Sequence, residues 1–146
     1  MRTEWITIYM QVLDQLKAEI QHYSDENNLF TVLQGTSNSA GNLAMHLVGN
    51  IRHFFGAILL ENGYIRDREH EFSGRSSRAE ILDGITSARQ NLIRYFDTAD
   101  SHSFEEPFPI PFKDQTVTKG YMYLMLLQHF TYHLGQINYH RRTLKP

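Results

Sequence analysis

Four stretches of the chain repeat apolar residues at intervals of three and four positions, which is typical of amphipathic α-helices. These stretches cover residues 3–23, 39–63, 77–97 and 118–142. Polar residues that favour helix starts precede each of them: Thr3, Ser39, Ser77 and Thr118. Gly63 is suited to follow the end of the second helix. The pattern therefore predicts four long helices.

The segments between these helices have no helical period. Residues 24–38 are polar, with room for one helical turn near 29–33, and residues 64–76 are charged. Residues 97–117 contain three of the four prolines, which favour an extended chain, a short edge strand or hairpin, or a lid. The long first and third links allow crossover connections. We therefore expect a single all-α domain over residues 1–146, a four-helix bundle with long crossovers.

Charge and composition exclude several classes of protein. The net charge is −2 and no basic face is evident, so we expect no nucleic-acid partner. No run approaches the roughly 18 apolar residues of a membrane span, so we expect no membrane partner either. The chain has no cysteine, which excludes disulfides, zinc–thiolate sites and a cysteine nucleophile, and fits a reducing cytoplasm.

The fourth predicted helix carries two histidines four residues apart. His129 and His133 lie about 40° apart on the helical wheel, with Gln136 on the same ridge and His140 near the helix end. Two imidazoles at this spacing can hold one metal ion. Alternatively, they are buried polar groups that satisfy one another or the backbone. Position 130 is Phe, where a zinc-protease motif needs Glu, so no catalytic residue is assigned.

A facing helix would have to supply a third ligand. His46 on the second helix is the best candidate and His53 is the next, while Gly49 would leave room for a neighbour or ligand. Three imidazoles with an open fourth position describe a catalytic type of metal site, and imidazole suits zinc, nickel, copper or iron. Gln136 and Asn50 are expected to orient ligands or bound water. The candidates for the rim of the site are His53, His140 and Tyr132.

Two motifs carry a resemblance to a known family. The segment 129–137, HFTYHLGQI, resembles the H-x-x-x-H-x-G-Q-[IL] signature of the DinB-like (YfiT-like) superfamily. The segment 42–53 resembles that family's H-[LM]-x-G-[NH] stretch, so that the resemblance spans nearly the whole chain. It implies a four-helix bundle that binds a divalent metal, most simply zinc or nickel, through His46, His129 and His133. Characterised relatives are transferases and isomerases that use low-molecular-weight thiols, which implies a small-molecule substrate and a thiol cosubstrate.

Two classes of function stay open at this level. One is a metal-dependent transferase or hydrolase that activates water or a thiol for transfer to a small electrophile. The other is a non-enzymatic metal- or ligand-binding module that serves as a dimeric scaffold. Tyr9 and Tyr132 are possible hydrogen-bond donors to a pocket in the first case. In both, we expect a homodimer through surplus apolar surface on the first and fourth helices: Trp5, Tyr9, Tyr121, Leu124 and Leu127.

Overall fold

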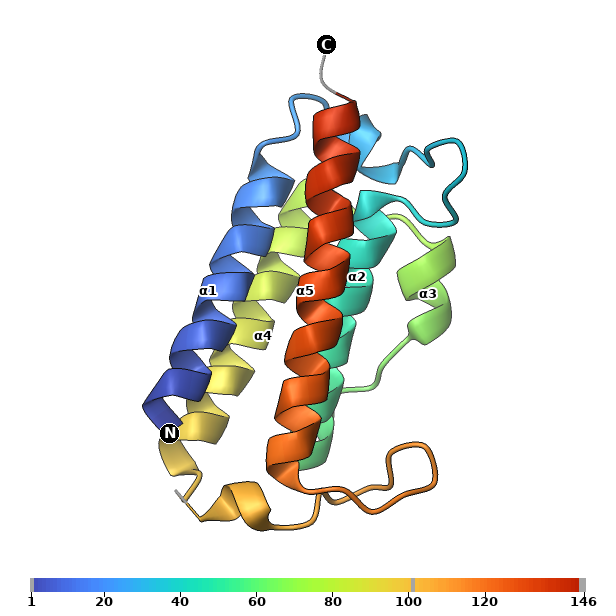
Figure 1. The fold of residues 1–146 in the computed structure, drawn as a ribbon. Helices are drawn as coiled ribbons and strands as arrows, with labels where there is room; N and C mark the ends of the chain where they lie inside the picture. The colour runs from blue at the N-terminus through green and yellow to red at the C-terminus, as the bar shows by residue number, and fades with distance from the viewer. Residues whose placement is uncertain (1, 101, 145–146) are drawn as a thin grey trace.

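The computed structural model describes residues 2–100 and 102–144 and shows an all-α bundle (Figure 1). Its long helices are α1 (Arg2–Gln21), α2 (Ala40–Ile51), which continues as η2 (Arg52–Leu59), α4 (Arg78–Thr98) and α5 (Lys119–Thr143). The shorter ones are η1 (Glu26–Phe30), α3 (Arg68–Ser73) and η3 (Ser103–Glu105). The prediction of an all-α fold is confirmed. None of the helices in the described ranges is both long and apolar enough to cross a membrane.

Side-chain caps set three of the four long helix starts where the sequence predicts them. Ser39, Ser77 and Thr118 each accept a hydrogen bond from the backbone N–H three residues later. Ser77 and Glu80 form a reciprocal capping box. The fourth prediction is wrong, because α1 begins at Arg2 and Thr3 lies inside its first turn. A polar N-cap is a preference of helix starts and not a requirement, so such a boundary can shift.

The second long helix ends differently from the prediction. It widens into a π-helix, η2, in which the Leu60 N–H donates to the Phe55 carbonyl across five residues. The wider turn finishes before Gly63, which has a φ of +79° in the following loop instead of closing the helix. The apolar period did not reveal this change, because a single π segment is too short to alter the period over the whole helix. Such π segments occur frequently near functional sites.

A short helix, α3, lies within the charged segment that showed no period. Asp67 caps it, and the Asn42 amide on α2 holds it by donating to the carbonyls of Glu71 at 3.0 Å and Gly74 at 2.9 Å. Figure 1 shows α3 lying beside α2, outside the bundle proper. Polar contacts hold it in place, so no hydrophobic pattern marked it in the sequence.

The proline-rich link closes the end of the bundle where α5 begins. Phe108 donates its N–H to Val117 at 2.8 Å and packs its buried ring against Phe54, and only isolated bridges form within the described residues. Of the conformations that the sequence allowed, the described residues therefore show no edge strand but an irregular hairpin, whose two arms are joined by the antiparallel bridges Pro107–Thr118 and Phe112–Gln115. The segment is packed over the bundle end and lies far from the loop that joins η1 to α2 (Figure 1).

Aromatic side chains fill the core at this end. Tyr9, Phe55, Phe96 and Tyr123 are fully buried and pack against one another, with Tyr9 edge-on to Phe55 and Phe96 edge-on to Tyr123. The Tyr9 hydroxyl donates to the Tyr123 carbonyl at 2.7 Å. Tyr9 is therefore a core residue. It is available neither as a pocket donor nor as part of an exposed dimer surface, contrary to both expectations, because its hydroxyl finds a partner inside the bundle.

Candidate metal centre

Three histidines meet where α2 packs against α5. His46 comes from α2, and His129 and His133 come from successive turns of α5, which runs in the opposite direction (Figure 1). One ring nitrogen from each lies within 4.8 Å of the other two, and the Nε2 atoms of His46 and His129 are 2.8 Å apart. The structure thus brings together the three residues singled out from the sequence.

His53 does not join this cluster. It follows His46 by seven residues, about 10 Å along the helix axis, and its ring packs against Phe54. Its position inside the π-helix further separates it from the α2 register. The choice between the two histidines was therefore decided by helix packing, in favour of His46.

An acidic residue that the sequence analysis missed anchors His46. The Nδ1 atom of His46 lies 2.9 Å from Oε2 of Glu71 on α3, and both side chains are buried. Arg66 holds the same carboxylate in a bidentate pair, with Nε 2.7 Å from Oε1 and Nη2 2.9 Å from Oε2. Burial alone would raise the pKa of Glu71, but the hydrogen bonds from His46 and Arg66 and the Arg66 charge lower it. Glu71 is therefore a carboxylate at neutral pH.

This carboxylate sets the tautomer of His46. An ionised Glu71 can only accept, so the Nδ1–H of His46 donates to it; in the neutral ring this places the lone pair on Nε2, which lies toward His129. Arg66 Nη2 also lies 3.2 Å from His46 Nδ1. Both atoms are donors, so this approach is not a hydrogen bond; they share the Glu71 oxygen instead.

Gln136 orients His133 as Glu71 orients His46, through a hydrogen bond to Nδ1. The Nδ1 atom of His133 lies 2.6 Å from Oε1 of Gln136, one turn later on α5, so its Nε2 is also left with a lone pair. Burial and the neighbouring histidines lower the pKa of His129 to about 4. Burial also lowers the pKa of His133, which the bond to Gln136 partly offsets. Both rings are therefore neutral at pH 7, the form in which imidazole binds metals.

Gly49 makes the anchoring carboxylate possible. A Cβ atom at this position would overlap Oε1 of Glu71, so only glycine lets the carboxylate lie against α2. The sequence indicated room for a neighbour or ligand here, and the neighbour is Glu71. The combination of a mid-helix glycine three residues after a ligand histidine with a distant acidic residue was the available signal. This signal did not identify which acidic residue would lie against Gly49.

The remaining predicted residues lie in different environments. Asn50 is buried one turn after His46, and its Oδ1 has no hydrogen-bond partner among the described residues. Tyr132 is 65% exposed, with its ring against His133. His140 is not exposed to solvent at the end of α5, which the sequence had allowed. It is buried, with Nδ1 2.7 Å from the Tyr23 hydroxyl and Nε2 2.7 Å from the Thr31 carbonyl, which serves to tie the end of α5 to the η1 loop.

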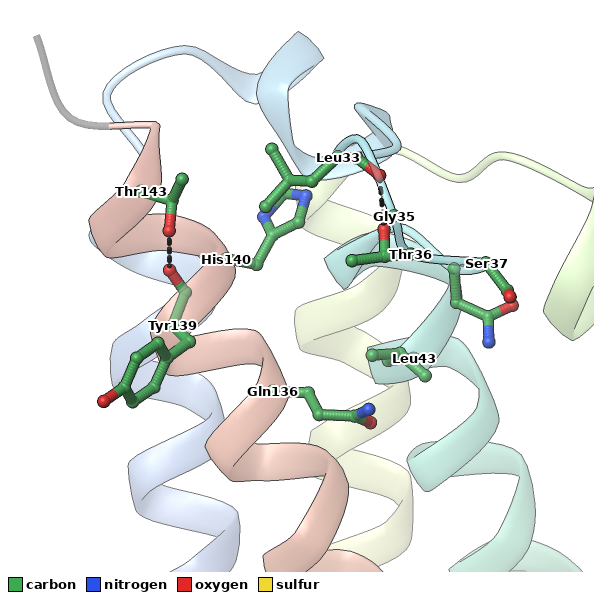
Figure 2. Close-up of a pocket in the computed structure, with 10 residues that line it drawn as sticks. Leu33, Gly35, Thr36, Ser37, Leu43, Gln136, Tyr139, His140 and Thr143 are labelled. Carbon is green, nitrogen blue, oxygen red and sulfur yellow. Dashed lines mark hydrogen bonds between the residues drawn. The ribbon is translucent and has the colours of Figure 1, made fainter.

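A cavity of about 490 Å³ opens one helical turn from the histidines. Its wall includes Gln136 and His140 from α5, Leu43 from α2, and the loop 33–38 (Figure 2). Leu43 precedes His46 by three residues and Gln136 follows His133 by three, so both metal-site helices continue into the cavity wall. The histidine cluster is therefore beside a space large enough for a small molecule.

The donor set fits a divalent ion of intermediate softness. Three imidazole nitrogens converge, two of them with the opposite ring nitrogen tied to a carboxylate or an amide oxygen, as is usual for histidines that bind metal. The unsatisfied Oδ1 of Asn50 adds a buried acceptor that a bound water would satisfy. Imidazole donors of this kind suit zinc, nickel, copper and iron alike.

Comparison with known proteins identifies the family of the chain. No curated protein matches the chain. One family model matches residues 2–146, which is nearly the full length. The chain therefore belongs to the family described as a protein of unknown function (DUF1572), which is a DinB-like family.

Proposed function

We propose that the protein is a metal-dependent enzyme in which His46, His129 and His133 hold one divalent ion, zinc or nickel. The observation that carries this proposal is the convergence of the three imidazoles, with His46 oriented by Glu71 and His133 by Gln136. Glu71 and Gln136 each bind the Nδ1 atom of their histidine, so Nε2 is the atom that remains to bind an ion, and in His46 this atom lies 2.8 Å from Nε2 of His129. Three protein ligands leave a position for a further ligand, which is the arrangement of catalytic metal sites.

The chemistry we propose is nucleophile activation. A bound cation lowers the pKa of a coordinated water or thiol and so supplies a nucleophile at neutral pH. The chain itself has no cysteine, and Glu71 is committed to His46 and Arg66, so neither can serve as the nucleophile or as a free base. We therefore propose a transferase or hydrolase that joins water or a low-molecular-weight thiol to a small electrophilic substrate. Its lack of cysteine suits a reducing cytoplasm, where we propose that it acts.

Metal content and turnover test this proposal together. Protein purified without a nickel column is analysed for metals, then assayed with a panel of low-molecular-weight thiols and an electrophilic acceptor such as 1-chloro-2,4-dinitrobenzene. Metal-loaded protein should catalyse transfer, and stripped and His129→Ala protein should not. Equal rates in all three would overturn the proposal. Stoichiometric metal without turnover for any thiol or for water would favour the non-enzymatic binding module instead.

We further propose that the protein forms a homodimer through the outer face of α5. This face exposes four large side chains along its length: Tyr121, Leu124, Tyr132 and Tyr139. Gly135 lies between the last two, and a Cβ there would meet no other group within 4 Å, so the helix surface is open at that point. A second copy of the same face would cover this apolar strip by two-fold symmetry.

A further inference from the structure

The cavity beside the histidines is lined by the loop 33–38 and by α2 and α5. Leu33 and Leu43 supply apolar surface from the loop 33–38 and from α2, and Gln136 extends from α5 toward Leu43 (Figure 2). The Thr36 hydroxyl donates to the Leu33 carbonyl at 2.8 Å, which holds the loop in its turn. The cavity thus combines apolar surface with uncharged polar side chains, a composition that suits a small molecule with both kinds of group.

Gln136 links this cavity to the proposed metal site. Its Oε1 is occupied by the His133 Nδ1–H at 2.6 Å. The amide nitrogen of the same side chain is therefore left to donate, and Gln136 is an exposed residue of the cavity wall. A ligand in the cavity that carries a carbonyl or similar acceptor can bond to this nitrogen. Such a bond would leave only the Gln136 side chain between the acceptor group and His133.

The wall discriminates by charge. Among the described residues that line the cavity, none is Asp, Glu, Lys or Arg. His140, the one imidazole among the described lining residues, already bonds Tyr23 and Thr31 through its two nitrogens. A carboxylate or phosphate in this space would lose its hydration without gaining a cationic partner, which is costly. An uncharged ligand has no such cost.

We infer that this cavity binds the substrate, and that the substrate is an uncharged, partly apolar molecule with a hydrogen-bond acceptor directed at Gln136. The inference rests on the proposed function, because it assigns the cavity to the site formed by the three histidines. It adds the class of substrate and the residues that select it. The apolar part lies between Leu33 and Leu43, and the acceptor lies at the histidine end.

The test uses a pair of probes with one shape and different charge, 2-naphthamide and 2-naphthoate. Binding is followed by ¹H–¹⁵N NMR of the whole protein, with the side-chain amide of Gln136 and the backbone amides of 33–38 as reporters. Naphthamide should shift these signals and bind at least about tenfold more tightly than naphthoate. Equal binding of the two probes, or shifts confined to other surfaces, would overturn the inference.

Two substitutions at the cavity mouth make the test specific. Thr143 lines the cavity, is exposed, and donates its hydroxyl to the carbonyl four residues earlier. Thr143→Trp should fill the space and abolish naphthamide binding, whereas Thr143→Lys should strengthen naphthoate binding. Thr86 on α4 is also exposed and makes the same kind of hydroxyl bond, to the Leu82 carbonyl. Thr86→Trp and Thr86→Lys should therefore change neither affinity. Unchanged binding in both Thr143 variants would overturn the inference.

A paramagnetic ion separates this inference from the proposed function. When Co²⁺ is added to the wild-type protein, the protons of bound naphthamide should broaden, and excess Zn²⁺ should reverse the effect. Co²⁺ that binds at the histidines without broadening the probe overturns the inference and leaves the metal site standing. Absence of any Co²⁺ or Zn²⁺ binding at the histidines overturns the proposed function and, with it, the assignment of the cavity as its substrate site.

Discussion

Nδ1 of His46 lies 2.9 Å from Oε2 of Glu71, although 25 residues separate them in the chain. This contact connects α2, which supplies a proposed metal ligand, to α3, which the Asn42 amide also holds against α2. It gives the His46 ring one tautomer and one orientation, and it depends on Arg66 and Gly49 on either side of the carboxylate.

Glu71→Gln should weaken metal binding by about 10- to 100-fold, because the amide is a poorer acceptor for His46 Nδ1–H and leaves Arg66 without its charge partner. Competition with a chromogenic chelator measures the affinity, and circular dichroism checks the fold. Glu69→Gln is the matched control, on the same short helix but exposed. Equal affinity for both variants would show that Glu71 does not support the site.

Gly49→Ala should lower both stability and metal affinity, although alanine is a better helix former by about 1 kcal/mol. The added Cβ would overlap the Glu71 carboxylate and displace α3. Gly135→Ala on α5 is the control, since its Cβ would meet nothing within 4 Å, and it should stabilise the protein slightly. Thermal melts measure the stability of both variants, and metal titrations measure their affinity. A stabilised Gly49→Ala protein with normal affinity would contradict the predicted overlap.

Each of His46→Ala, His129→Ala and His133→Ala should lose most metal binding while the bundle stays folded, because most of the core lies away from these rings. Elemental analysis should give one ion per wild-type chain. His53→Ala, on the same helix as His46 but outside the cluster, should retain it. Full metal content in His133→Ala would refute the assignment.

The pH dependence follows from the two histidines on α5. Their folded-state pKa values are lowered, that of His129 to about 4, from the usual value of 6.5. The unfolded chain therefore binds more protons between pH 6.5 and 4, so the metal-free protein should lose stability as the pH falls through this window. Metal binding should persist below pH 6.5 and fail as the pH approaches the pKa of His129, about 4. Chemical denaturation and metal titration at several pH values measure both; stability that rises on acidification would contradict the environment described for these rings.

Light scattering should show twice the 17.1 kDa chain mass at micromolar concentration if the outer face of α5 forms a dimer. Leu124→Glu, at a position 58% exposed, should shift the protein to the monomer. Ile93→Glu introduces the same charge on an exposed position of α4 and should not. A wild-type monomer would refute the dimer.

Local features of the sequence determined the helices. Ser39, Ser77 and Thr118 mark helix starts through bonds made within three residues, and the apolar period marks the buried face. The pairing of His129 with His133 is equally local, because four residues make one helical turn. The resemblance of the two histidine motifs to one family pointed to His46 before the bundle was seen.

Contacts between distant segments decided the rest. The pairing of His46 with Glu71, the burial of His140 and the π-turn before Gly63 depend on which surfaces pack together, and no local period encodes that choice. The segment that carries Glu71 looked structureless because its helix is held by polar bonds to Asn42 and His46 instead of by a hydrophobic stripe. The sequence by itself therefore determined the four long helices and the three histidines, whereas the tertiary structure decided how one of those histidines is oriented and what space lies beside it. The physical reason is that helix formation depends on neighbours in the chain, while the partner of a buried polar group can come from any part of it.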